Sequence, residues 1–185
     1  MRSVSSLSCF AALLLFGCGG NQPDIPTEDL TFPKGFRFGS AIAGFQAEMG
    51  CPSIAKSECE FASDWSDYVT RPELIAKKGL YLSGDPLSSG PGFYELYKSD
   101  IALVATELHN NSLRLSIEWG RVFPKATDGI DGYEDLKRAA DPKALAFYHG
   151  VFSELKKRQI RPLVTVIHYV LPAWIHDAYG CHIDF

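Results

Sequence analysis

The sequence predicts an α/β fold: the N-terminal part, about three strands, of a (β/α)8 TIM barrel that is incomplete in this chain. Two observations predict it. Segments typical of strands alternate with segments of helical periodicity, as in parallel α/β folds. Residues 163–167 form an apolar, β-branched run with no polar face, which is typical of a strand covered on both sides. A complete barrel takes about 250 residues, so we expect residues 32–185 to form a partial barrel domain.

The first 31 residues are predicted to lie outside the fold. Residues 1–17 combine Arg2 with a short apolar core at residues 7–16, which indicates a secretory signal peptide of the lipoprotein type. Cys18 follows directly and is the candidate for lipidation, and residues 18–31 read as a flexible linker. A plain signal peptide cleaved nearby is the alternative. We therefore expect an exported protein, lipid-anchored to a bacterial membrane on its periplasmic or cell-surface side.

Export would place the remaining cysteines in an oxidising compartment. Cys51 and Cys59 are close in sequence and form a possible disulfide, which would leave Cys181 unpaired. A metal site is not expected, because no second Cys/His pair with ligand spacing follows.

The first strand is expected at residues 36–43, where small residues indicate close packing. Residues 44–50 would form the loop at its C-terminal end. A long excursion rich in Ser, Gly, Pro and Asp then covers residues 51–90. A loop of this length in a compact domain is usually functional.

Helical spacing of apolar residues predicts a helix at residues 93–108, ended by an Asn in the left-handed conformation. Residues 112–118 then alternate strictly. In a barrel, Leu and Ile would lie under the helices, while Arg114, Ser116 and Glu118 would line the interior. The alternative is an antiparallel strand with water on its polar face.

A second helix is predicted to begin after Asp141, the N-cap, with Pro142 at the first helical position. The apolar strand at residues 163–167 follows, opened by Pro162 and ended by His168. Because substrates bind at the C-terminal ends of barrel strands, His168 is a candidate ligand for a polar substrate. The alternative is a buried histidine with no chemical role.

Composition limits the partners. The chain is 46% hydrophobic and 22% charged, with a formal net charge of −4, which are ordinary values for a globular protein. An acidic balance argues against nucleic acid or an anionic membrane surface as partner. We expect no nucleic-acid partner, and contact with a membrane only through the lipid anchor.

Four separated motifs resemble one family. They are Phe-Pro-Lys-Gly-Phe-Arg-Phe-Gly at residues 32–39, Ala-Gly-Phe-Gln-Ala-Glu-Met-Gly at 43–50, Arg-Leu-Ser-Ile-Glu-Trp-Gly-Arg-Val-Phe-Pro at 114–124 and His-Tyr-Val-Leu-Pro at 168–172. They are similar to the N-terminal portion of glycoside hydrolase family 1, the β-glucosidase and β-galactosidase family. The motifs of the long excursion look like its archaeal-type branch.

The resemblance implies a retaining (β/α)8 glycosidase without a cofactor, acting on a β-linked saccharide or glycoside. Gln46 and His168 match substrate-binding residues of the sugar subsite, and Tyr169 stands where an aromatic side chain lines it. Arg114 matches the arginine beside the catalytic nucleophile. The family's Asn-Glu-Pro and Glu-Asn-Gly motifs, which supply the acid/base and the nucleophile, do not occur in this sequence. No catalytic residue is therefore expected in this chain.

Glu48 and Glu118 are an alternative carboxylate pair, since glycosidases need two carboxyl groups. The family does not use these positions, and an ion pair of Glu118 with Arg114 or Arg121 is the favoured expectation. The predicted function is the N-terminal fragment of a retaining β-glycosidase, inactive alone, which the C-terminal part of the barrel could complete. The alternative function is a non-catalytic carbohydrate-binding or relic lipoprotein. We also expect the open strand at residues 163–167 to make the isolated chain prone to aggregation.

Overall fold

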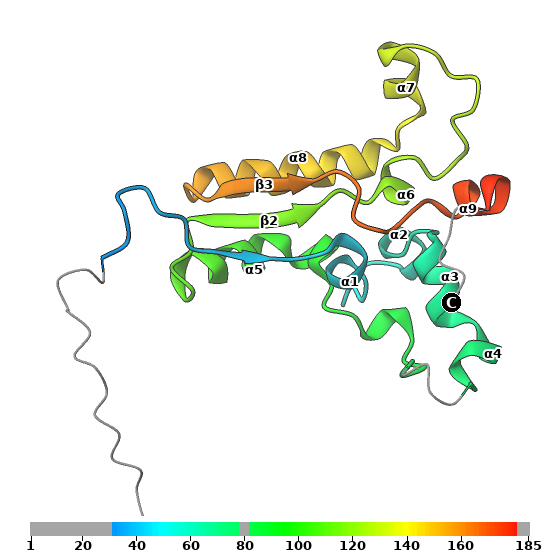
Figure 1. The fold of residues 1–185 in the computed structure, drawn as a ribbon, viewed down its shortest axis with the longest axis horizontal. Helices are drawn as coiled ribbons and strands as arrows, with labels where there is room; N and C mark the ends of the chain where they lie inside the picture. Colours follow the sequence, from blue (N-terminus) through cyan, green and yellow to red (C-terminus); the bar gives the residue numbers. More distant parts are fainter. Residues whose placement is uncertain (1–30, 78–81, 181–185) are drawn as a thin grey trace, which may run out of the picture. The chain divides into compact units, whose positions relative to one another are not determined.

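The structure is a computed structural model that describes residues 31–77 and 82–180 (Figure 1). The chain divides between Phe36 and Arg37 into two units, which are described separately. In the first unit, the Phe36 N–H donates to the Pro33 carbonyl over 2.9 Å and closes a turn. The rings of Phe32 and Phe36 lie 4.4 Å apart between centroids. The signal peptide, Cys18, nearly all of the linker and Cys181 lie outside the described residues.

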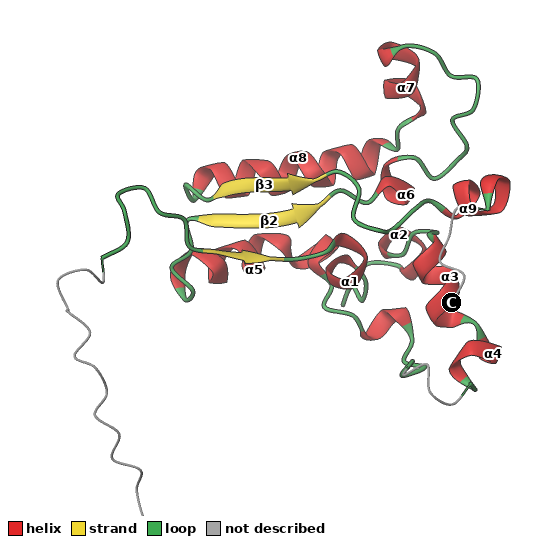
Figure 2. Ribbon diagram, viewed as in Figure 1, coloured by secondary structure: helices red, strands yellow, loops and turns green. Residues whose placement is uncertain are grey.

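The second unit contains the sheet and the helices that cover it (Figure 2). In chain order the elements are β1 (Gly39–Ala41), α1 (Gly44–Glu48), α2 (Lys56–Cys59), α3 (Asp64–Thr70), α4 (Pro72–Ile75), the 3₁₀ helix η2 (Leu87–Ser89), α5 (Phe93–Thr106), β2 (Ser112–Ser116), α6 (Trp119–Val122), α7 (Tyr133–Ala139), α8 (Pro142–Lys157), β3 (Arg161–Thr165) and α9 (Ala173–Tyr179).

The three described strands form one parallel sheet in the order β1-β2-β3. Parallel neighbours need long crossovers, and here α5 lies in the crossover from β1 to β2 and α8 in that from β2 to β3. The predicted first strand is shorter than expected, with three residues in place of eight. The third strand begins two residues earlier than predicted and ends at Thr165, whose carbonyl accepts from the Ile117 N–H over 3.1 Å.

Pro162 lies inside β3 rather than before it. The Arg161 N–H donates to the Asn111 carbonyl, and the Thr165 carbonyl also faces β2. Since backbone groups alternate along a strand, residues 162 and 164 direct theirs to the outer edge. The missing N–H of Pro162 therefore costs the β2–β3 ladder nothing.

The core lies between one face of the sheet and helices α5 and α8, which lie on the same side of it (Figure 1). Leu113 and Leu115 of β2 are almost fully buried there, as the alternating pattern predicts. Ile101 of α5 and Val151 and Leu155 of α8 complete the centre of this cluster. Burying side chains of this size stabilises the fold by about 1.5–3 kcal/mol each.

The predicted cap of the second long helix matches the structure, since the Asp141 carboxylate accepts from the Ala144 N–H over 2.9 Å. The expected end of the first long helix is wrong in detail. The left-handed residue there is His109, with φ of 50°, and not an asparagine. Asn111 lies two residues further on, and its side-chain oxygen accepts from the Phe38 N–H over 3.0 Å.

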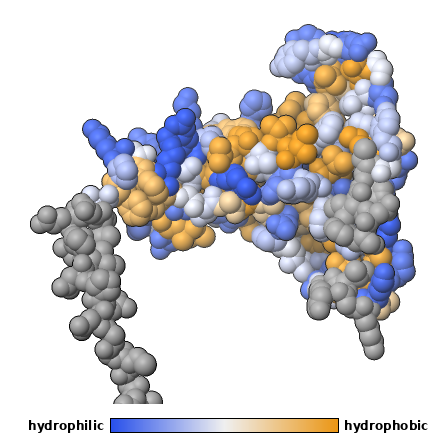
Figure 3. Space-filling model, viewed as in Figure 1, coloured by the Kyte–Doolittle hydropathy of each residue, from blue (hydrophilic) through white to orange (hydrophobic). Residues whose placement is uncertain are grey.

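The strand predicted to be buried on both sides is exposed. Leu163 keeps 61% of its surface accessible and Val166 keeps 71%. The reason is topological, because β3 is the edge of the described sheet and no helix covers the face on which Leu163 lies. Figure 3 shows hydrophobic surface gathered over the sheet beside the C-terminal half of β3. Among the described residues, no helix combines the length and apolar character needed to cross a bilayer.

Candidate active-site face

The open face of the sheet, opposite α5 and α8, carries the candidate site. Strand register aligns Ala41 of β1, Arg114 of β2 and Leu163 of β3 in one row across it. Side chains of paired residues in a parallel sheet point to the same face, and Leu113 and Leu115 point to the other one. Arg114 therefore lies on the open face, and His168 follows β3 at the C-terminal end of the sheet.

Arg114 and His168 are in contact, although they are 54 residues apart in the chain. Nη2 of Arg114 lies 3.4 Å from Nε2 of His168. Arg114 Nε and His168 Nδ1 are both buried without a hydrogen-bond partner among the described residues. In the described part of the chain, no carboxylate forms an ion pair with Arg114. This guanidinium is therefore a partly buried cation without a counter-charge among the described residues, next to an imidazole with an unused polar atom.

Gln46 and Tyr169, the other two predicted subsite residues, do not take part in the contact between Arg114 and His168. Gln46 is the third residue of α1, and its side chain is exposed. It borders two shallow hollows, one against Phe93 of α5 and one against the 85–90 segment. Tyr169 has a left-handed backbone with φ of 65°, and its ring is 80% exposed and 5.8 Å from that of His168.

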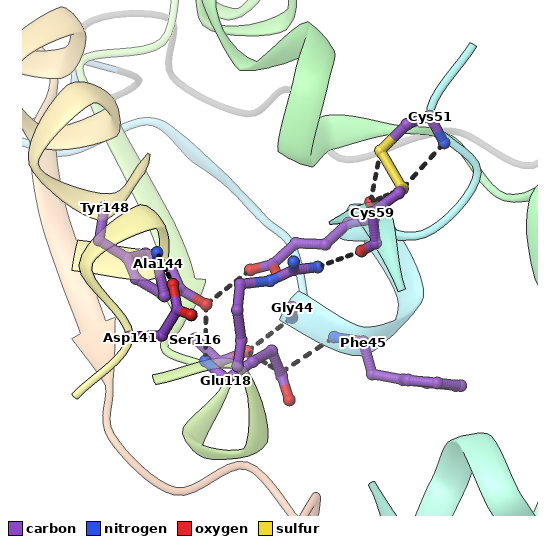
Figure 4. Close-up of polar contacts among 11 residues, drawn as sticks. Gly44, Phe45, Cys51, Cys59, Ser116, Glu118, Asp141, Ala144 and Tyr148 are labelled. Atoms are coloured by element: carbon purple, nitrogen blue, oxygen red, sulfur yellow. Dashed lines mark hydrogen bonds and ion pairs between the residues drawn. A yellow bond between two sulfur atoms is a disulfide. The ribbon is translucent and has the colours of Figure 1, made fainter. Parts of the chain in front are cut away.

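A second polar cluster lies buried between α1, α2, α6 and α8 (Figure 4). Glu48, the last residue of α1, is 1% exposed and accepts from Arg121 Nε over 2.6 Å. The Tyr148 hydroxyl donates to its other oxygen over 2.9 Å. Arg121 Nη2 also donates to the Cys59 carbonyl over 2.8 Å, and its guanidinium lies 4.0 Å from the ring centroid of Tyr94. The charges of Glu48 and Arg121 are thus paired with each other.

Glu118 does not form the arginine pair expected of it. Its Oε1 accepts from the Phe45 N–H over 2.9 Å and from the Ser116 hydroxyl over 3.3 Å. Arg121, one helical turn further on, is turned toward Glu48 and the aromatic rings instead. Ser116 and Glu118 do not line an open interior either, because α1 covers them and each is 2% exposed.

Burial shifts the pKa values of this cluster. It raises the pKa of Glu118 to about 7, and the nearby charge of Glu48 adds to the effect. Burial also raises the pKa of Glu48, opposed by the charge of Arg121 and by the Tyr148 hydroxyl. The pKa of the Tyr148 hydroxyl is raised for the same reason, and by the charge of Glu48.

The geometry gives Glu48 and Glu118 structural partners rather than access to a substrate. Both are nearly inaccessible, and their hydrogen bonds go to Arg121, Tyr148 and the start of α1. Sequence reasoning missed the pairing of Glu48 with Arg121 and Tyr148. Tyr148 was a signal for it, because a buried tyrosine hydroxyl needs a hydrogen-bond partner.

The long excursion is tied to the same region. A disulfide joins Cys51 and Cys59, with 5.9 Å between their Cα atoms. Asp64 Oδ1 accepts from the Leu171 N–H over 3.0 Å, so the excursion also meets the segment after β3. No group of three or more His, Cys, Asp or Glu side chains within residues 31–77 and 82–180 is arranged to hold a metal ion.

Comparison with known proteins identifies the family. The family model "Glycosyl hydrolase family 1" matches residues 28–184 of this chain. The chain belongs to glycosyl hydrolase family 1. The prediction from the four motifs is thereby confirmed.

Curated members of family 1 resemble the chain over about 80% of its length. A β-galactosidase from Sulfolobus acidocaldarius is 32% identical over 168 residues, which are 80% of this chain and 33% of that protein. Beta-glucosidase 19 from Arabidopsis thaliana is 34% identical over 151 residues, 81% of this chain and 25% of that protein. The chain thus spans about a third of the length of the relatives it matches, or less.

Solved family 1 structures confirm the fold class. The hyperthermophilic β-glucosidase from Pyrococcus furiosus superposes with a TM-score of 0.67 at 36% identity, over 79% of this chain and 33% of that one. The described sheet, three parallel strands with helices on one face, is consistent with an incomplete family 1 barrel.

Proposed function

We propose that the chain is the N-terminal portion of a retaining β-glycosidase, and that it contributes half of a sugar-binding subsite for a β-linked saccharide. The observation that carries the proposal is the contact of Arg114 with His168 on the open face, where barrel enzymes bind substrate. Arg114 has an unmatched positive charge there, and His168 an unused polar atom. Family membership supplies the reaction class: hydrolysis of O-glycosidic bonds.

The family resemblance implies the roles of the four residues, and the chemistry of their side chains suits those roles. An imidazole and an amide each offer hydrogen-bonding atoms that suit vicinal hydroxyls, so His168 and Gln46 would bind the sugar. Tyr169 would supply an aromatic wall. Arg114 would lower the pKa of a carboxylate placed beside it and keep that nucleophile ionised.

Retaining hydrolysis needs two carboxyl groups about 5–5.5 Å apart, one as nucleophile and one as acid/base. The Asn-Glu-Pro and Glu-Asn-Gly motifs that carry them in the family do not occur in these 185 residues. We therefore propose that this chain alone has no glycosidase activity. The exposed edge of β3 is the place where further barrel strands would pair.

The test assays an aryl β-glucoside with two samples: the chain alone, and the chain co-expressed with a polypeptide that carries both missing motifs and the remaining strands. We expect no turnover from the chain alone and measurable turnover from the pair. In the pair, His168→Ala and Arg114→Gln should each lower kcat/KM by about 100-fold or more. Exposed Leu103→Ala on α5 is the matched control and should change nothing.

Two outcomes would contradict the proposal. Turnover by the chain alone that is abolished in Glu48→Gln or Glu118→Gln would make the buried carboxylates catalytic. Binding of a β-glucoside without turnover in either sample would favour the non-catalytic carbohydrate-binding lipoprotein. The reading frame downstream of Phe185 is an independent check, since both motifs should be encoded there or in a neighbouring gene.

A further inference from the structure

We infer that Ser116, at the end of β2, and Glu118, two residues further on, are positioning residues for Gln46, because they cap the N-terminus of the short helix that carries it. The inference rests on the proposed function for the role of Gln46 as a sugar ligand. The capping itself can be tested without any sugar.

The first turn of a helix has N–H groups without partners in the helix, and a side chain just before it usually accepts from them. In α1 that position is Ala43, which has no side chain that could do so. The acceptors come instead from the last residue of β2 and from Glu118, two residues beyond it. Ser116 Oγ accepts from the Gly44 N–H over 2.6 Å, and Glu118 Oε1 accepts from the Phe45 N–H over 2.9 Å.

The close approach of helix and strand depends on a glycine. A Cβ on Gly44 would lie 2.3 Å from Glu118 Oε1 and 2.4 Å from its Cγ, far inside contact distance. Any larger residue would force the Glu118 side chain or α1 to move, which would disturb the bond from the Phe45 N–H. Glycine is therefore needed at position 44 because a side chain would clash with Glu118, and not because of the backbone conformation.

The other end of α1 is held by the second polar cluster. The last residue of α1, Glu48, binds Arg121 and Tyr148. The Tyr148 hydroxyl also accepts from the Glu118 backbone N–H over 2.8 Å. Helix α1 is thus fixed at its start by the residues at the end of β2 and at its end by α6 and α8 (Figure 4). Gln46 lies between these two anchors with its side chain free.

Glu118 is the capping residue whose charge can change with pH. The titratable and charged groups that face it are Glu48 of α1, Arg121 of α6 and Tyr148 of α8. Its Oε2 is buried and has no hydrogen-bond partner among the described residues. Loss of its proton strengthens Oε1 as an acceptor for the Phe45 N–H, so local opening of this one bond should become rarer as Glu118 ionises, although the buried charge lowers the free energy of global unfolding.

Residue-resolved amide hydrogen exchange on the full chain in mild detergent tests the cap. We expect Glu118→Ala to speed exchange at Phe45 by about tenfold, the loss expected for one hydrogen bond. Glu118→Gln keeps an oxygen acceptor and should stay within about threefold of the wild type. Ser116→Ala should act on Gly44 in the same way. After correction for intrinsic exchange, protection at Phe45 should rise between pH 6 and pH 8 in the wild type and stay flat in Glu118→Gln.

Glu95→Ala is the matched control, since the Glu95 carboxylate also accepts from backbone N–H groups, those of Ser53 and Ile54, but lies outside this cap. It should leave Gly44 and Phe45 unchanged. Unchanged exchange at Phe45 in Glu118→Ala would overturn the inference. If that variant does not fold, unchanged exchange at Gly44 in Ser116→Ala together with a flat wild-type pH profile at Phe45 would overturn it equally.

Methyl β-glucoside binding by the completed barrel links the cap to Gln46. Glu118→Ala should weaken binding about as much as Gln46→Ala, and Glu118→Gln should restore it. If the wild type binds no glycoside while the exchange results hold, the proposed function fails and the cap stands. If glycoside binds but Phe45 exchange does not respond, the cap fails and the proposed function stands.

Discussion

At the scale of single residues, Glu118 should make stability depend on pH. Its pKa is about 7 in the folded chain against an ordinary 4.5, so between these values the folded state holds a proton that the unfolded state has lost. Its contribution is complete below pH 4.5 and is lost as pH rises through 7. The loss amounts to roughly 2–3 kcal/mol.

Glu118→Gln removes this titration. We expect the variant and the wild type to unfold at similar urea concentrations at pH 4.5, and the variant to be the more stable at pH 8. Urea unfolding followed by tryptophan fluorescence at both values measures it. Parallel pH profiles of the two proteins would show that folding does not shift the pKa of Glu118.

The buried Glu48 and Arg121 illustrate what sequence could not predict. Sequence reasoning placed both glutamates near strand ends and assigned an arginine to Glu118, because spacing along a chain favours the nearer residue. The actual partner of Arg121 is 73 residues away, selected by the aromatic rings of Phe61 and Tyr94 around its guanidinium. Contacts of this kind depend on three-dimensional packing and leave no periodic signal.

At the scale of elements, the Cys51–Cys59 disulfide closes the first part of the excursion onto α1. Cys59 is buried, and its carbonyl binds Arg121. A loop of 8 residues corresponds to about 2–3 kcal/mol of stabilisation by chain entropy. We expect Cys51→Ala/Cys59→Ala to lower the free energy of unfolding by this amount under oxidising conditions. Under reducing conditions, wild type and variant should unfold alike; a difference that persists there would assign the effect to packing.

The exposed edge strand is the element that should govern solubility. Val166 is apolar, uncharged and 71% exposed beside the open edge of β3. We expect Val166→Lys to raise the soluble fraction of the lipid-free chain, measured by centrifugation and light scattering. Leu103→Lys introduces the same charge at a residue 54% exposed on α5 and should help much less. A monodisperse wild-type monomer with a cooperative thermal transition would contradict this account.

Helices and strands with a periodic pattern could be predicted from the sequence. The position of a strand at the edge of the sheet could not. The alternation in β2 and the Asp141 cap of α8 match the structure because both follow from local sequence. The burial of residues 163–167 was wrong because β-branched runs look the same whether or not a neighbouring strand exists. The contact of Arg114 with His168 was implied only by family resemblance and strand topology. The exposure of Gln46 and Tyr169 depends on what covers the open face.

At the scale of the whole molecule, we propose that the protein is exported and tethered by lipid on Cys18. The apolar run at residues 7–16 with Cys18 close behind it supports this. Mass spectrometry of protein extracted from membranes should find a diacylglyceryl adduct on an N-terminal Cys18. Cys18→Ser should lose the adduct and release the protein from membranes. An unmodified N-terminus at another residue would refute the anchor.

Pro162 has a consequence for how the sheet could grow. On the outer side of β3 it offers a carbonyl but no N–H, so the first donor available to an incoming strand is that of Val164. A strand that slides two residues toward the start of β3 gives up one hydrogen bond, worth about 1 kcal/mol. That penalty disfavours one misaligned pairing by roughly fivefold. Pro162 would thus help to set the register of an added strand, because it favours the pairing whose first hydrogen bond is donated by Val164.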